Sequence, residues 1–302
     1  MNMPKVSISC VTYNHEPFLR ECFDGFLMQQ CDFEFEILVY DDASTDKTQE
    51  IITEYQSKHP GIFKPILQTE NQWSKGVRGI NVKFNFPRVK GKYIALCEGD
   101  DYWIDPLKLQ KQVDFLEQNQ EIGLVHTNYK ILNENTSQLL TKKVLNRNNE
   151  NEHYHKTGDI RFLTVLFRSK YLTQIQELFN QDFMLKSTAA DRALFMLIST
   201  LSKLHFLNFT SGVYRIGTQD SASNFQEKEK EILFKKNMTE LNISLFDYLA
   251  ISKHRKKFED GLIYYTALLK YKKNFFKTFY LLIRKRVEIN YFKQYIYYLI
   301  KG

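Results

Sequence analysis

Acidic residues follow two of the apolar runs in this 302-residue sequence. The run 93–97 leads directly into Glu98, Gly99, Asp100 and Asp101. Glycine allows a sharp turn of the backbone, and carboxylates spaced this closely can hold a hard divalent cation through oxygen ligands. An isolated sequence of this kind also suits a solvated acidic turn. Its position behind a buried strand, opposite a second acidic strand end, favours a metal site.

The second acidic strand end is the pair Asp41 and Asp42, which follows the apolar run 35–40. After it, Ser44 and Asp46 suit the start of a helix, where a serine caps the first turn and an acidic residue complements the helix dipole. Capping does not require two aspartates immediately after the strand. One of them is therefore expected to accept hydrogen bonds from a nucleobase or a ribose.

A further carboxylate, Asp191, precedes the apolar helical segment 193–201. A single aspartate at the start of a helix is more often a cap than a catalytic group. The residue type alone therefore leaves both roles open.

Alternating strands and helices are expected to position these groups. Such alternation predicts β-α-β units and a mostly parallel sheet, in which ligands bind at the carboxyl ends of the strands. The polar, asparagine-rich segment 133–157 is predicted to be a loop or excursion. The expected strands cover residues 6–11, 35–40, 62–68, 93–97 and 122–129, and the expected helices cover 17–30, 48–58, 76–89 and 105–118.

Composition excludes several classes of protein. Hydrophobic residues make up 43% and charged residues 25% of the chain, which is typical of a globular protein. The four cysteines form no C-x-x-C pair, so neither a disulfide scaffold nor a cysteine zinc site is indicated. No apolar run reaches the roughly 18 residues of a membrane-spanning helix, and the N-terminus lacks a signal-peptide pattern. These features predict a reduced, cytoplasmic protein.

The excess of positive charge lies in the C-terminal quarter of the chain. Residues 226–302 hold 17 Lys and Arg against 8 Asp and Glu, whereas the preceding 225 residues hold 25 against 27. We therefore predict one domain over 1–217 and a helical, basic and aromatic extension over 218–302. The extension suits either contact with an anionic membrane or a helical bundle packed on the first domain. No motif supports binding of nucleic acid, so none is expected.

Taken together, residues 4–216 resemble the family 2 glycosyltransferases, which have the GT-A nucleotide-diphospho-sugar transferase fold. Each matching stretch is weak alone, but the ordered set is specific. The matching stretches are 6–14 (VSISCVTYN), 36–46 (EILVYDDASTD), 91–106 (GKYIALCEGDDYWIDP) and the segment around Asp191.

The resemblance implies an inverting transfer of a sugar from a nucleotide-diphosphate donor, often UDP-linked, with Mn²⁺ or Mg²⁺ as cofactor. The expected acceptor is a hydroxyl of a glycan or a lipid-linked molecule, in bacterial surface polysaccharide or lipopolysaccharide synthesis. The resemblance implies that Thr12 and Tyr13 line the base pocket and that Asp42 binds the base, with Asp41 beside it. It implies that Asp100 binds the ribose and the metal, that Asp101 is a metal ligand, and that Glu98 takes the first position of the D-x-D variant. Asp191 would be the general base.

One departure concerns the end of the domain. Many relatives carry a histidine shortly after a Tyr-Arg pair, but here Tyr214 and Arg215 are followed by Ile216 and Gly217. The expected histidine is therefore missing, and a second protein contact to metal or diphosphate is not expected from this position. Arg215, the loop 218–223 and Glu98 are the candidates for contacts to phosphate or substrate.

Two other functions compete with this interpretation. A nucleotidyltransferase that makes the nucleotide sugar needs a glycine-rich, basic phosphate loop after the first strand, and 12–18 is not one. A non-catalytic membrane module on a transferase fold needs no acidic site. The presence of Asp42, Asp100, Asp101 and Asp191 argues against that second alternative.

Overall fold

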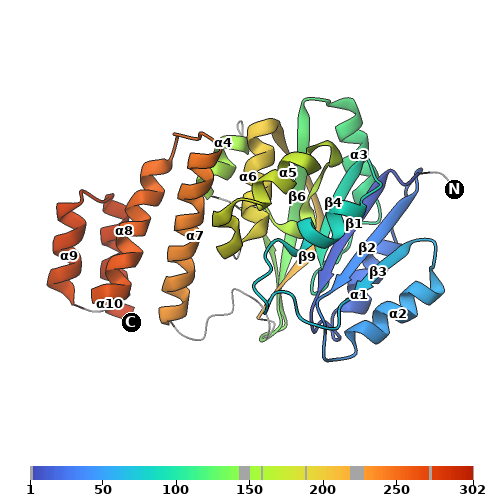
Figure 1. The fold of residues 1–302 in the computed structure, drawn as a ribbon, viewed down its shortest axis with the longest axis horizontal. Helices are drawn as coiled ribbons and strands as arrows, with labels where there is room; N and C mark the ends of the chain where they lie inside the picture. Colours follow the sequence, from blue (N-terminus) through green and yellow to red (C-terminus); the bar gives the residue numbers. More distant parts are fainter. Residues whose placement is uncertain are drawn as a thin grey trace. The chain divides into compact units, whose positions relative to one another are not determined.

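The chain separates into two compact units (Figure 1). The first unit comprises residues 1–185 and 190–221, and the second comprises residues 186–189 and 222–302. The predicted boundary between residues 217 and 218 adjoins a segment outside the described residues, so its position stays a prediction. The computed structural model describes residues 3–142, 150–157, 159–187, 189–217, 228–271 and 274–301.

The first unit is built on one mixed sheet flanked by helices, which confirms the predicted α/β fold class. Its strand order is β3-β2-β1-β4-β8-β6-β9-β5, with β7 paired to β6. The pairs among β1 to β4 are parallel, as is β6 with β9, and the remaining pairs are antiparallel. The strands are β1 (Val6–Thr12), β2 (Phe35–Asp41), β3 (Phe63–Leu67), β4 (Tyr93–Glu98), β5 (Tyr102–Trp103), β6 (Ile122–Asn133), β7 (Gln138–Lys142), β8 (Leu166–Arg168) and β9 (Lys203–Ile216).

The core of this unit lies between the parallel strands and three amphipathic helices. In α1, apolar residues recur at helical spacing as Leu19, Cys22, Phe23 and Phe26, and all are buried. They share a core with residues of α2 and α3 and with alternate residues of β1, β2 and β4. The helices are α1 (Leu19–Leu27), α2 (Thr48–Lys58), α3 (Lys108–Gln118), α4 (Glu150–Thr157), α5 (Leu172–Phe179) and α6 (Ala190–Leu201), with short turns η1 (Asn81–Asn85), η2 (Phe86–Arg88), η3 (Phe162–Thr164), η4 (Ser169–Tyr171) and η5 (Asp182–Lys186).

Two segments differ from the sequence-based expectation. The helix expected over 76–89 is a π-helical turn, η1, followed by a 3-10 turn, η2. The side-chain amide of Asn85 donates to the carbonyls of Cys10 (3.2 Å) and Leu38 (3.1 Å), which ties this segment to β1 and β2. Within the predicted loop 133–157, strand β7 and helix α4 form, and residues 143–149 lie outside the described residues.

The second unit contains four helices among the described residues. Its apolar core includes Leu268 of α8 and Leu282 of α9. The buried carboxylate of Asp260 accepts from the backbone N–H of Glu288 at 3.0 Å, just before α10. None of the described helices is both long and apolar enough to cross a bilayer. The helices are α7 (Lys228–Tyr248), α8 (Arg255–Tyr271), α9 (Phe275–Arg284) and α10 (Ile289–Lys301).

Candidate active site

The ends of β1, β2 and β4 meet at one edge of the sheet. Because these strands are parallel, Thr12 pairs with Asp41 across β1 and β2, and Val11 pairs with Glu98 across β1 and β4. The strand ends predicted to carry a ligand are therefore adjacent. Thr12 is buried at this edge, and Tyr13 follows it half-buried.

The loops after β1 and β2 are joined by reciprocal hydrogen bonds. The backbone N–H of Asn14 donates to Ser44 Oγ at 2.9 Å, and the N–H of Thr45 donates to Asn14 Oδ1 at 2.8 Å. Both loops are thereby held in one arrangement beside the acidic strand ends.

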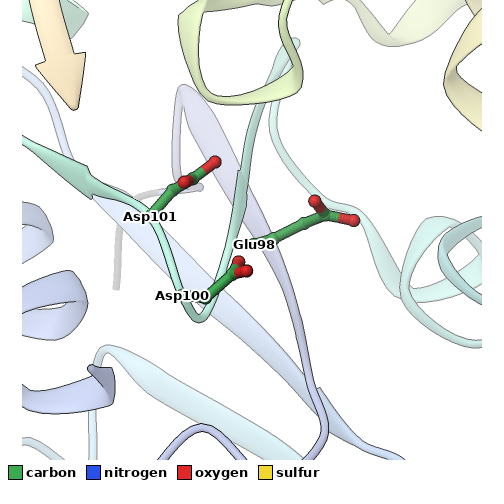
Figure 2. A group of neighbouring side chains, drawn as sticks. All are labelled: Glu98, Asp100 and Asp101. Carbon is green, nitrogen blue, oxygen red and sulfur yellow. The ribbon is translucent and has the colours of Figure 1, made fainter. Parts of the chain in front are cut away.

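Glu98 ends β4, and Asp100 and Asp101 follow it in a tight turn (Figure 2). We call residues 98–101 the carboxylate turn. Side-chain oxygens of Glu98, Asp100 and Asp101 all lie within 4.8 Å of one another. The turn is tight at Gly99, where an added Cβ would stand 2.9 Å from Thr12 Oγ1. Glycine at this position therefore lets the carboxylates pack against the end of β1.

Mutual repulsion and loss of hydration disfavour full ionisation of this cluster. The Glu98 side chain is partly accessible to solvent. Loss of hydration at its carboxylate and the negative charges of Asp100 and Asp191 nevertheless raise its pKa to about 8. Burial and the charge of Asp100 also raise the pKa of Asp101, although Asp101 Oδ1 accepts the backbone N–H of Arg215 at 2.9 Å. A bound cation would reverse both effects.

The donor set fits a hard divalent cation. Carboxylate oxygens are the ligands that Mg²⁺ and Mn²⁺ prefer, and the three groups lie close enough to share one ion. Nearby, Thr12 Oγ1 is buried and has no hydrogen-bond partner among the described residues. A buried polar atom of this kind is costly unless a ligand or water satisfies it.

The raised pKa of Glu98 predicts a pH-dependent stability. Its pKa in the folded protein lies above the ordinary carboxyl value of about 4.3, so the stability gained by keeping Glu98 neutral is lost as pH rises toward about 8. With metal removed by EDTA, we expect the melting temperature of the wild-type protein to fall by a few degrees, relative to Glu98→Gln, between about pH 5 and about pH 8.

Differential scanning fluorimetry across this pH range measures that difference, and Glu121→Gln on the exposed surface serves as the charge-matched control. Parallel curves for wild type and Glu98→Gln would contradict the crowding of charge at this turn.

Asp191 lies in the first turn of α6, half-buried. Burial raises its pKa, while the N–H of Arg192, 2.7 Å from Asp191 Oδ1, and the charge of Arg161 oppose that rise. Its charge in turn acts on Glu98. The fold therefore brings Asp191 into electrostatic range of the carboxylate turn, some 90 residues earlier in the chain.

The two aspartates at the end of β2, Asp41 and Asp42, have distinct protein partners. Asp41 is fully buried and accepts from Ser44 N–H (3.0 Å), Ser44 Oγ and Gln49 Nε2 (2.6 Å), so it organises the turn into α2. Asp42 accepts from the N–H groups of Gln72 (2.8 Å) and Trp73 (3.0 Å). Their contacts to a nucleotide stay predictions.

Arg215 contacts several protein groups at the end of β9. Its guanidinium pairs with Glu21 and with Glu134 (2.8 Å), donates to the carbonyl of Asp100 at 2.5 Å, and stacks over the ring of Tyr102. It thereby clamps β9 to the carboxylate turn. Its predicted phosphate contact is not tested by these contacts and stays a prediction.

Gly217 follows the Tyr-Arg pair, where the resemblance leads us to expect a histidine. Its φ of +84° lies in the left-handed region that favours glycine, and an added Cβ would stand 2.5 Å from Asn135 Nδ2. A larger residue would be strained in this backbone conformation and would displace the Asn135 side chain. The other predicted phosphate contact, the loop 218–223, lies outside the described residues.

Sequence reasoning missed two features of this region. One is the segment 71–73, which holds the Asp42 carboxylate through its backbone and places the half-exposed ring of Trp73 under Arg78. The other is Arg161, whose charge acts on Asp191. Neither belongs to a motif, and only their contacts in the fold identify them.

Comparison with known proteins identifies the family. The model of the glycosyl transferase family 2 matches residues 7–175, so the chain belongs to this family. Among curated proteins, the Mycobacterium tuberculosis protein Rv1520 is 47% identical over 120 residues, a match that covers 38% of this chain and 32% of that protein. The chain thus spans about a third of this relative's length.

Solved structures confirm the GT-A type of fold. Staphylococcus aureus TarS 1–349, in complex with UDP-GlcNAc, superposes with a TM-score of 0.61 at 18% identity and covers 98% of this chain and 79% of that one. The mannosyltransferase PcManGT of Pyrobaculum calidifontis, in complex with GDP-Man and Mn²⁺, gives 0.58 at 15% identity, with 99% and 86% covered.

Proposed function

We propose that this chain is an inverting glycosyltransferase that moves a sugar from a nucleotide-diphosphate donor to a hydroxyl group. The acceptor hydroxyl belongs to a glycan or a lipid-linked molecule. The reaction serves the synthesis of a bacterial surface polysaccharide. The observation that carries the proposal is the cluster of Glu98, Asp100 and Asp101 at the strand edge, with Asp191 in electrostatic range. A UDP-sugar is the first donor to test, and the complexes of TarS and PcManGT with nucleotide sugars support this class of ligand.

The carboxylate turn would hold Mn²⁺ or Mg²⁺, with Asp101 and Asp100 as ligands. A divalent cation at this place supplies a Lewis acid that stabilises the negative charge of the departing diphosphate. Thr12 and Tyr13, at the end of β1, would line the base pocket. Asp41 lies beside that pocket, and Asp42 would contact the base.

Asp191 would act as the general base. It accepts the proton of the acceptor hydroxyl while the acceptor oxygen bonds to the anomeric carbon and the bond from that carbon to the diphosphate breaks. A single displacement inverts the anomeric centre and needs only one side-chain base. The raised pKa of Asp191 makes it a better proton acceptor than an ordinary aspartate.

A thermal-shift panel of nucleotide sugars, with and without Mn²⁺, tests this proposal. A donor that binds only the folded state raises the melting temperature. We expect at least one nucleotide sugar to do so, with a larger shift when Mn²⁺ is present. If no nucleotide sugar changes the melting temperature under either condition, the proposal fails.

The partner of the second unit is an anionic membrane surface. On α9, the exposed fractions of Phe276, Tyr280 and Ile283 are 82%, 64% and 55%, and their spacing places them on one face of the helix. Exposed Lys277 and Arg284 belong to the same helix. A helix with exposed aromatic residues and cations suits the interface of an anionic bilayer, which would place the enzyme at the cytoplasmic face of the membrane, near a lipid-linked acceptor.

Neutralising these cations is expected to release the protein from vesicles. The variant changes Lys277, Arg284, Lys285 and Arg286 to Gln; Lys272 and Lys273, which extend the cationic sequence, lie outside the described residues. Each basic residue near an anionic surface contributes about 1 kcal/mol. Partition onto phosphatidylglycerol vesicles, measured by flotation at low salt, should therefore fall roughly a hundred- to a thousandfold.

The matched control changes four exposed cations of the first unit, Arg20, Lys58, Lys75 and Lys92, to Gln. It should keep its vesicle binding although its net charge is the same. Equal losses in both variants, or no flotation of the wild type, would contradict the membrane assignment.

A further inference from the structure

Arg161 stands directly before η3, at a point fixed to the carboxylate turn. Its carbonyl accepts from Thr164 Oγ1 at 2.7 Å and from the N–H of Thr164 at 3.1 Å. In the same short turn, the carbonyl of Leu163 accepts the indole N–H of Trp103 at 2.9 Å, and Trp103 follows Asp101 by two residues. The backbone that carries Arg161 is therefore tied to the segment that carries the carboxylates.

The guanidinium of Arg161 has few protein partners. Among the described residues it makes one long hydrogen bond, 3.4 Å to the Tyr129 hydroxyl, and lies 5.2 Å from the centre of the Tyr214 ring. No carboxylate of the described chain forms an ion pair with it. An arginine carries five N–H donors, so most of its donors face no protein acceptor although the side chain is half-buried.

Other enclosed arginines of the first unit differ in this respect. Arg168 donates to the carbonyls of Ile122 (2.9 Å) and Leu116 (2.5 Å), and Arg88 donates to two carbonyls and to an asparagine side chain. Arg215 pairs with two glutamates. These arginines hold the fold together, whereas the donors of Arg161 stay available.

The surroundings of Arg161 place it in the site. Its charge acts on Asp191, the proposed base. The ring on which it lies, that of Tyr214, feels the charges of Asp101, Glu98 and Asp100. Arg161 thus lies in electrostatic range of the proposed base, on backbone that is tied to the segment with the carboxylates. The paired N–H donors of its guanidinium match the oxygens of a phosphate.

We propose that Arg161 binds a phosphate group of the substrate. The proposal rests on the proposed function and deepens it, because it assigns the protein cation that faces the charge left on a departing diphosphate. Two sources carry this chemistry: the donor's diphosphate and the diphosphate of a lipid-linked acceptor. The site requires at least one of them.

Calorimetric titration of the full chain tests the proposal, with UDP, GDP and their nucleosides in Mn²⁺. Arg161→Gln removes the positive charge of the side chain. Arg161→Lys keeps the positive charge and removes the paired N–H donors of the guanidinium. We expect the affinity for the nucleoside diphosphate to fall roughly 10- to 100-fold in Arg161→Gln and less in Arg161→Lys, while nucleoside binding is unchanged. The control is Arg20→Gln, an exposed arginine paired with Glu54.

Geranyl diphosphate, added to protein already saturated with the nucleotide, tests the other source. If nucleotide affinity is unchanged but geranyl diphosphate binding is lost in Arg161→Gln, the phosphate belongs to the acceptor. If wild type and both variants bind both probes equally, Arg161 binds no phosphate and the proposal is overturned. If the wild type binds neither UDP nor GDP, the proposed function itself fails. Should Arg161→Gln not fold, Arg161→Lys carries the same comparison.

Discussion

Replacing Asp191 by asparagine is expected to abolish sugar transfer while leaving the binding of donor and metal nearly intact. A general base acts in the chemical step, and losing it costs about 10²- to 10⁴-fold in rate. Asn keeps the shape of the side chain and the acceptor for the N–H of Arg192, which lies 2.7 Å from Asp191 Oδ1. The measurement is the single-turnover rate of transfer, beside donor affinity by calorimetry.

The control is Asp114→Asn on the exposed face of α3, which should leave the rate unchanged. The wild-type rate should also fall as pH drops below the pKa of Asp191, which burial holds above its ordinary value. A large loss of donor affinity at a normal maximal rate would make Asp191 a binding residue. Unfolding of the variant would make it a helix cap.

Asp101→Asn is expected to remove the dependence of donor binding on metal and to reduce transfer to background. Asp101 is almost fully buried, so its charge is costly unless a cation lies beside it. The asparagine oxygen can still accept the N–H of Arg215, which is 2.9 Å from Asp101 Oδ1. The metal-free variant should therefore be at least as stable as the wild type.

Titration of Mn²⁺ followed by donor, in wild type and variant, measures this effect. Asp105→Asn is the matched control, because this aspartate follows the same turn but pairs with Lys111 outside the cluster. Normal turnover of Asp101→Asn in the same metal would show that the metal is held elsewhere.

The parallel part of the fold and the acidic edge are predictable from sequence. Each strand of β1, β2 and β4 is a short apolar run followed by polar residues, so the pattern fixes both the strand and its end. Parallel pairing then requires these ends to meet, as Thr12 with Asp41 and Val11 with Glu98 do. Local pattern therefore suffices for the carboxylate turn and its neighbours.

Features that depend on long-range contacts are not predictable in this way. The turn η1 departs from a regular helix where Asn85 bonds to the carbonyls of two strands about 50 and 75 residues away. The few protein contacts of the Arg161 guanidinium, and the two ion pairs of Arg215, depend on residues far away in the sequence. Residue type alone does not show how the two arginines differ, whereas their contacts in the fold do.

The measurement that tests the central claim most directly is product analysis with a nucleotide sugar that the thermal-shift panel identifies. The chain is incubated with that donor and Mn²⁺, with and without acceptor lipid extract, and the nucleotide products are separated by ion-exchange chromatography. Our account predicts release of free nucleoside diphosphate that requires the metal and is absent in Asp101→Asn. A parallel incubation supplies a nucleoside triphosphate and a sugar 1-phosphate. Release of pyrophosphate there, with no nucleoside diphosphate formed from the donor, would identify a nucleotidyltransferase and contradict the proposed function.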